Sequence, residues 1–202
     1  MDNQNLSPSL EAETQTSNNK DKNEEKQTIV ARLYDWLEIF AVSVAVVFII
    51  FAFVARVAIV DGNSMNDTLK DGDKLLVSEL FYTPKQGDII VCQAEYFGPE
   101  EPLVKRIVAT EGQTIRIDTE NWQVFVNDIE LEEDYVKHII GRDMHGWSYG
   151  EEYTVPKGHV FVMGDNRNNS ADSRDSRVGP IDERYIIGKV IFRFSPKFGF
   201  VK

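Results

Sequence analysis

Two hydrophobic patterns divide the chain. Residues Ile39–Ala55 form an apolar run without charge, in which Ser43 is the only polar side chain. From Val57 onward, short apolar runs alternate with turn residues, which is typical of β-strands. The pattern therefore predicts one apolar helix followed by a mostly β domain.

The second pattern predicts eight strands and one clear hairpin. Thr114–Asp118 alternates apolar and polar residues, as a half-buried strand does. Val124–Leu131 is typical of a hairpin that turns at Asn127 and Asp128, two residue types that tolerate positive φ. We expect a compact β-sheet or barrel-like domain, with strands at Lys74–Leu80, Gly87–Gln93, Val104–Thr110, Thr114–Asp118, Gln123–Val126, Tyr153–Val155, His159–Met163 and Ile186–Phe194.

The 17-residue apolar run is long enough to cross a bilayer as a helix. A buried helix of a soluble protein would show a polar face, and a strand would be shorter. A cleavable signal peptide would have a short basic leader, whereas this leader has 38 residues and is net acidic. We expect an uncleaved transmembrane anchor over 36–57, with Tyr34 and Trp36 at the membrane interface.

The regions on either side of the anchor differ in composition. Residues 1–35 contain few large apolar side chains before Ile29, so we expect a disordered tail. Residues 58–202 form the predicted β domain. The net charge of −11 argues against nucleic acid as a partner. The lone Cys92 excludes an internal disulfide and lies in an apolar run, so we expect it to be buried and structural.

Several familiar catalytic and metal-binding patterns are weak or missing. The histidines, His138, His145 and His159, have no metal-ligand spacing, and the polar loop 164–175 lacks the spacing of a calcium loop. The G-x-S-x-G string at 146–150 lacks the flanking strand and helix of a nucleophile elbow, so we interpret it as a chance match in a loop. A Ser-His-Asp triad stays open, because its members come from distant positions.

Three other segments carry candidate chemistry. Ser64 follows the apolar run closely, Lys105 lies in an apolar strand, and Gly164–Arg174 is a dense polar loop after another apolar strand. Each has an ordinary explanation when taken alone: a turn serine, a solvated lysine and a salt-bridged turn.

Taken together and in this order, these segments resemble the type I signal peptidases. Ser64–Leu69 matches Ser-Met-x-Pro-Thr-Leu except for Asp67 in place of proline, and Gly87–Val91 matches a Gly-Asp followed by β-branched residues. Lys105–Val108 opens a third motif, which then departs at Ala109, Glu111 and Gln113. Gly164–Arg174 matches Gly-Asp-Asn-Arg-x-x-Ser-x-Asp-Ser-Arg in full. The single anchor and small size resemble the Gram-positive branch.

The resemblance implies a membrane-bound serine endopeptidase with a Ser64/Lys105 dyad and no cofactor or metal. It implies that Ser170 orients the lysine, that the Ser64 N–H is an oxyanion donor, and that a frame is formed by Asp165, Arg167, Asp172 and Arg174. It further implies exported preproteins as substrates, a cytoplasmic N-terminus, and a catalytic domain outside the cell membrane. Gly62 stands where some members carry a second oxyanion hydroxyl, and Asp67 lacks the fixed φ of proline.

The proposed base must be a neutral lysine. A free lysine is almost wholly protonated at neutral pH, but burial lowers its pKa because desolvation disfavours the ammonium. The apolar neighbours of Lys105 suit that demand, and we expect Arg106 to point to the opposite face and remain solvated.

Two other functions compete with this one. A self-cleaving Ser/Lys repressor would carry a DNA-binding domain and lack an anchor. A membrane-anchored chaperone or assembly factor descended from a peptidase would usually have lost the serine or the lysine. Aromatic residues could contact the membrane interface or belong to the core, and these are Phe81, Tyr82, Phe194, Phe198 and Phe200.

Overall fold

The computed structural model describes residues 29–49, 51, 56–98, 101–136 and 142–201. The chain divides into two units, residues 1–51 and 52–202. In the first unit, 29–49 are helical, so the helix includes 29–35, which the sequence analysis assigned to the tail. No helix in the described part of the chain is long and apolar enough to cross a membrane. The rest of the predicted tail lies outside the described residues.

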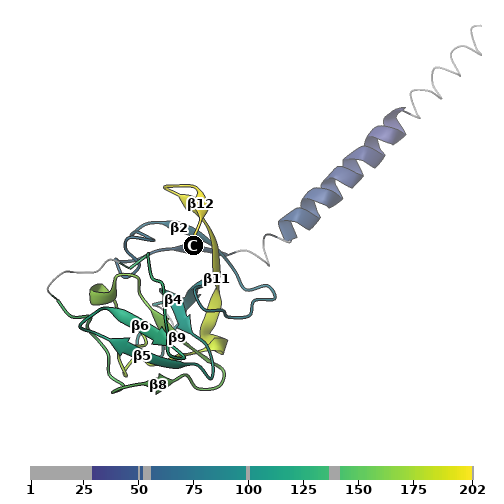
Figure 1. Ribbon diagram of the computed structural model, residues 1–202. Helices are drawn as coiled ribbons and strands as arrows, with labels where there is room; N and C mark the ends of the chain where they lie inside the picture. The colour runs from purple at the N-terminus through teal and green to yellow at the C-terminus, as the bar shows by residue number, and fades with distance from the viewer. Residues whose placement is uncertain (1–28, 50, 52–55, 99–100, 137–141, 202) are drawn as a thin grey trace, which may run out of the picture. The chain divides into compact units, whose positions relative to one another are not determined.

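The second unit is mostly β, as the sequence predicted (Figure 1). Arg56 and Val57, which the sequence placed at the end of the apolar anchor, instead belong to the first strand. The described strands are β1 (Arg56–Ile59), β2 (Lys74–Ser78), β3 (Ile89–Cys92), β4 (Leu103–Ala109), β5 (Thr114–Asp118), β6 (Gln123–Val126), β7 (Ile129–Glu130), β8 (Tyr153–Thr154), β9 (His159–Met163), β10 (Ile181–Asp182), β11 (Ile186–Ser195) and β12 (Gly199–Phe200). Two short 3₁₀-helices, η1 (Arg167–Asn169) and η2 (Glu183–Tyr185), follow β9 and β10.

The strands form two antiparallel sheets. The larger has the order β1-β2-β11-β3-β4-β9-β10, with β12 paired to β11, and the smaller has the order β7-β6-β5-β8. The predicted hairpin joins β6 to β7, and Asn127 and Asp128 at its turn have φ of 51° and 64°. All eight predicted strands are present within a few residues of their predicted ends.

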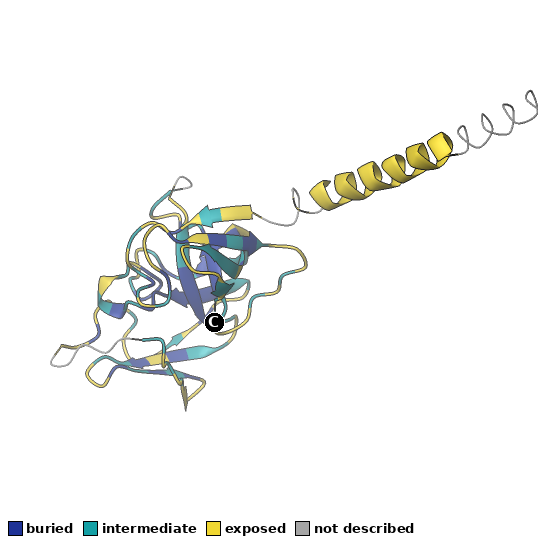
Figure 2. Ribbon diagram, turned by 90° about the horizontal axis from the view of Figure 1, so that it is seen from above, coloured by how far each residue is buried: buried dark blue, intermediate teal, exposed yellow. Residues whose placement is uncertain are grey.

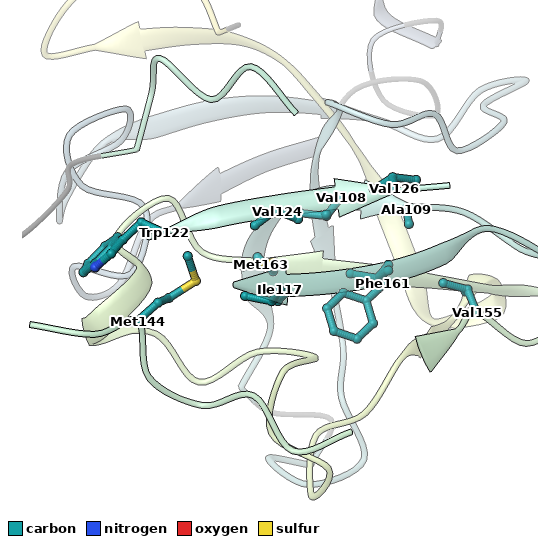
Figure 3. Packing of buried hydrophobic residues seen from close by; sticks show 11 residues of the cluster. Val108, Ala109, Ile117, Trp122, Val124, Val126, Met144, Val155, Phe161 and Met163 are labelled. Atoms are coloured by element: carbon teal, nitrogen blue, oxygen red, sulfur yellow. The ribbon is translucent and has the colours of Figure 1, made fainter. Parts of the chain in front are cut away.

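A hydrophobic core joins the two sheets. Val108 of β4 and Phe161 and Met163 of β9 meet Ile117 of β5 and Val124 of β6, as Figure 3 shows. A second cluster includes Val77 of β2, Ile89 of β3, and Met65 and Leu69 of the turn that carries Ser64. Strands β3, β4 and β9, which are neighbours inside the larger sheet, consist mostly of buried residues, and Figure 2 shows buried residues gathered in the interior of the β domain. The centre of this sheet is therefore a rigid support for side chains at its surface.

Cys92 fits its predicted structural role. It is fully buried in β3, where it belongs to a third apolar cluster with Ile90 and Ile107. Burial raises the pKa of the Cys92 thiol to about 12, which keeps it protonated and unreactive at neutral pH.

Candidate active site

Ser64 and Lys105 meet in the structure. The Lys105 Nζ atom lies 2.8 Å from Ser64 Oγ, although the two residues are 41 positions apart in the chain. Ser64 lies in a turn between β1 and β2, and Met65 and Leu69 hold this turn because both are completely buried. The Leu69 N–H also donates to the Met65 carbonyl, which closes the turn.

Lys105 is a buried amine on a central strand. It lies in β4 opposite Ile90 of β3, and it is only 3% exposed. Its Nζ also donates to the Val104 carbonyl at 3.2 Å. Burial lowers the pKa of Lys105, and this desolvation outweighs the opposing effect of the Asp172 carboxylate. The arrangement favours the neutral amine that could accept a proton from a hydroxyl.

The environment of Arg106, the residue after Lys105, contradicts the prediction that its side chain is solvated. We expected it to be solvated, but it is buried and forms two hydrogen bonds with Asp165, at 2.9 and 2.8 Å. It also donates to the Gly87 carbonyl, and its guanidinium lies 3.9 Å from the ring centre of Tyr135. A guanidinium can be buried when its donors are occupied and its flat face stacks on an aromatic ring.

Asp165 connects three of the sequence motifs. Besides Arg106, it accepts a hydrogen bond from the Thr68 hydroxyl, in the turn that carries Ser64. One carboxylate therefore links the serine turn, the lysine strand and the polar loop after β9. Thr68 belongs to the Ser64–Leu69 motif, but nothing in the sequence analysis pointed to this role.

Arginines of the polar loop form two further buried ion pairs. Asp172 accepts three hydrogen bonds from Arg174, two from its guanidinium and one from its backbone N–H, and Arg167 pairs with Glu133. Burial alone would raise the pKa of Asp172, but Arg174, the Gly164 N–H and the neighbouring Ser170 hydroxyl together hold it below its usual value. Sequence reasoning missed Glu133, because it lies in an acidic run from which no pattern selects one residue.

Gly164 brings the polar loop against the serine turn. A Cβ atom at this position would lie 2.3 Å from Ser170 Oγ and 2.5 Å from the Ser64 carbonyl oxygen. Such distances leave no room for a side chain. The requirement for glycine here is close approach of the backbone, since Gly164 does not have a left-handed φ.

Ser170 is close to this centre, but it makes no contact with the lysine that qualifies as a hydrogen bond. Its Oγ is buried and has no partner with hydrogen-bond geometry among the described residues. The hydroxyl interacts with the Asp172 carboxylate and lowers its pKa, although no hydrogen bond between them meets the usual geometry.

The remaining candidate features lie elsewhere. The G-x-S-x-G string is irregular backbone, as we expected. His145 contributes its backbone carbonyl to Arg174, and His159 lies at the start of β9. Within the described ranges, no three histidine, cysteine or acidic side chains gather as metal ligands. A surface hollow beside the serine turn is lined by Asp67, Thr68, Asp134, Tyr135 and Val136.

A β domain with a serine and a buried lysine in contact suggests a peptidase, and comparison with known proteins agrees. The chain belongs to the signal peptidase family, peptidase S26, whose family model matches residues 33–195. It is therefore a hydrolase that cleaves peptide bonds.

Individual relatives come from plants and bacteria. Thylakoidal processing peptidase 1 of Arabidopsis thaliana is 37% identical over 68% of this chain and 41% of its own length. Signal peptidase IB of Staphylococcus aureus is 30% identical over 81% of this chain and 90% of its own. The crystal structure of a signal peptidase I from Enterococcus faecalis, 23% identical, overlaps 54% of this chain and 97% of its own with a TM-score of 0.44.

Proposed function

We propose that the protein is a membrane-bound serine endopeptidase that cleaves signal peptides from exported preproteins, with Ser64 as nucleophile and Lys105 as general base. The observation that carries the proposal is the 2.8 Å contact between Lys105 Nζ and Ser64 Oγ at a buried amine. The family, and the name signal peptidase IB of the Staphylococcus aureus relative, support signal-peptide processing as the reaction.

The chemistry follows from these two groups. Neutral Lys105 takes the proton of Ser64 as Oγ attacks the scissile carbonyl carbon. The Ser64 N–H stabilises the oxyanion of the tetrahedral intermediate. The intermediate collapses to an acyl-enzyme, and the Lys105 ammonium gives its proton to the leaving amine. That amine is the new N-terminus of the mature protein, and the signal peptide stays on Ser64 as an ester. Lys105 then takes a proton from water as the water attacks the ester, and this proton returns to Ser64 Oγ as the signal peptide leaves with a free C-terminal carboxyl group.

Ser170 has the role of orienting the lysine in this proposal. Its buried Oγ lacks a regular partner, so a small movement of the Lys105 amine could give both groups a hydrogen bond. Asp165, Arg167, Asp172 and Arg174 have the role of a frame, because each is buried and ion-paired.

Membrane attachment is supported by the apolar run and by one face of the larger sheet. Val57 pairs with Leu76, Leu76 with Phe192, and Phe192 with Phe200, so these four side chains share a face. Val57, Phe198 and Phe200 are each more than 60% exposed. In this proposal residues 39–55 anchor the chain, this apolar face rests on lipid, and the catalytic domain lies outside the cell with the N-terminus in the cytoplasm.

The aromatic residues that the sequence placed either at the membrane interface or in the core differ in their exposure. Phe81, Phe198 and Phe200 are exposed and suit contact with lipid, while Tyr82 and Phe194 are partly buried. Anchoring next to the bilayer would raise the effective concentration of the enzyme near a membrane-tethered substrate.

The proposal is tested on the full-length chain in detergent micelles with a preprotein substrate. Ser64→Ala and Lys105→Ala should each abolish cleavage at the signal-peptide junction, while circular dichroism shows the β fold retained. Lys189→Ala is the matched control, because Lys189 is a lysine of the same sheet whose Nζ pairs with Asp88 instead of Ser64. Undiminished cleavage by either dyad variant would exclude the mechanism.

A further inference from the structure

Asn166 contacts the nucleophile turn twice. Its backbone N–H donates to the Ser64 carbonyl at 2.9 Å, and its side-chain Nδ2 donates to the Asn63 carbonyl at 3.0 Å. The Asn63 carbonyl also accepts the Asn66 N–H at 3.2 Å. The peptide group between Asn63 and Ser64 is therefore held from two sides through its oxygen.

The side chain of Asn166 departs from the usual behaviour of its position. Asn166 precedes the helix η1, where an asparagine oxygen commonly accepts a free N–H of the first turn. Here the side chain makes no capping bond and is directed to Asn63 instead. Local rules that are broken in this way are expected at functional positions.

The backbone around Asn166 is well supported. Asp165, before it, is bonded to Arg106 and Thr68, and Arg167, after it, is bonded to Glu133. Both neighbours are buried. Asn166 is therefore a fixed point against which the exposed end of the serine turn can be held.

The orientation of one peptide group decides where the Ser64 N–H points. The carbonyl of Asn63 and the N–H of Ser64 belong to the same planar unit and point in opposite directions. We infer that Asn166 is a positioning residue: by holding the Asn63 carbonyl, it keeps the Ser64 N–H directed at the oxyanion that develops on the substrate. This inference rests on the proposed function, in which that N–H is an oxyanion donor.

A matched pair of variants isolates this contact. Asn168, two residues further on, also donates through Nδ2 to a backbone carbonyl, that of Asp143, at 3.0 Å, and accepts the His145 N–H. Asn168→Ala therefore removes an equivalent donor of the same loop without touching the serine turn. Asn166→Asp serves as a second, nearly isosteric variant that lacks the Nδ2 donor and keeps the backbone contact.

The variants are compared as full-length chains in detergent micelles, with a preprotein-derived peptide as substrate. We expect Asn166→Ala to lower kcat by about 10- to 100-fold, less than complete removal of an oxyanion donor, because the N–H is still present. KM should stay within about twofold of the parent value, since substrate binding is not altered. The pH midpoint of activity should stay within about 0.3 pH units, since Lys105 is not altered. Asn168→Ala should stay within about threefold of the parent in kcat.

A substrate-derived peptide aldehyde gives a second measurement. Its adduct with Ser64 carries the oxygen that the N–H would bind, so its affinity should fall in parallel with kcat/KM in Asn166→Ala. The affinity of a non-cleavable peptide of the same sequence should be unchanged. A merely structural role for Asn166 would weaken both ligands equally.

Several results would overturn the inference. The first is an equal loss of kcat in Asn166→Ala and Asn168→Ala. The second is a raised KM with unchanged kcat in Asn166→Ala. The third is a shifted pH midpoint that accounts for the loss of kcat in Asn166→Ala. If Asn166→Ala fails to fold, as judged by circular dichroism, Asn166→Asp decides by kcat and aldehyde affinity. If the parent chain cleaves the substrate, Ser64→Ala does not, and Asn166→Ala is fully active, this inference is wrong but the proposed function stands. Activity that survives Ser64→Ala would remove the proposed function as well.

Discussion

Arg106 and Asp165 form a two-bond ion pair, at 2.9 and 2.8 Å, directly beside the lysine of the site. Both side chains are at most 3% exposed. Because Arg106 follows Lys105 in β4, the pair fixes the strand that carries the amine to the loop that carries Ser170.

Removing one member of this pair should be costly. Arg106→Gln leaves the buried Asp165 without its main partner, so we expect the free energy of unfolding to fall by roughly 3–5 kcal/mol. Arg184→Gln, at a pair whose arginine is 84% exposed, should cost far less, because solvent screens an exposed ion pair. Urea denaturation of both variants measures the difference, and equal losses would contradict the role assigned to Arg106.

Gly164 should not tolerate even a methyl group. Gly164→Ala would place a Cβ atom 2.3 Å from Ser170 Oγ and 2.5 Å from the Ser64 carbonyl, so the serine turn must move. Displacements of about 1 Å at a catalytic site can cost about 100-fold, and we expect kcat/KM to fall by at least that factor. Gly199→Ala is the control, because no atom lies within 4 Å of the added carbon and its φ is not left-handed. A Gly164→Ala enzyme with parental kcat/KM would show that the close contact has no importance.

The pH dependence of cleavage should report the buried amine. Lys105 has a lowered pKa because it is desolvated, and only its neutral form can accept the Ser64 proton. The rate should therefore rise with pH, with a midpoint below the pKa of an ordinary lysine, and should vanish at acid pH. A profile of kcat/KM against pH measures this midpoint, and a flat profile between pH 5 and 10 would be incompatible with lysine as the base.

The burial of Lys105 should also lower the stability of the folded protein at neutral pH. Between its lowered folded pKa and the ordinary value, the unfolded chain binds more protons than the folded chain, so stability rises with pH in this window. Lys105→Met removes that effect, and we expect it to be more stable than the parent by roughly 1–3 kcal/mol at neutral pH. The advantage should shrink as pH rises towards the ordinary lysine value. Denaturant titrations at several pH values test this, and a less stable methionine variant would contradict it.

Ser170 should affect activity more than stability. Its buried hydroxyl has no regular hydrogen bond, so Ser170→Ala removes a desolvated polar group and should leave the free energy of unfolding within about 1 kcal/mol of the parent. If the hydroxyl orients Lys105 during the reaction, kcat should fall by at least tenfold. Thermal unfolding and steady-state kinetics separate the two effects, and unchanged kcat would exclude the orienting role.

Much of the fold could be read from local pattern. The alternation in Thr114–Asp118 and the Asn127-Asp128 turn specify a strand and a hairpin through interactions between near neighbours, and both are present. Cys92 is buried as its apolar run predicted. The short strands β1, β10 and β12 were missed, because two to four residues carry too little pattern and depend on a partner strand.

The candidate site was also predicted in part from the sequence and decided in part by the fold. The sequence alone determined the family and, through it, predicted which residues would carry the chemistry, since the order and spacing of Ser64, Lys105 and Gly164–Arg174 resembled one family. Only the tertiary structure decided that Lys105 is desolvated against Ser64, that Arg106 is buried on Asp165, and that Glu133 is the partner of Arg167. Burial and ion pairing join residues that are 34 to 59 positions apart, and they arise when strands β4 and β9 pack beside the serine turn. Such contacts leave no periodic trace in a single sequence, because each depends on the positions of both partners in the folded chain.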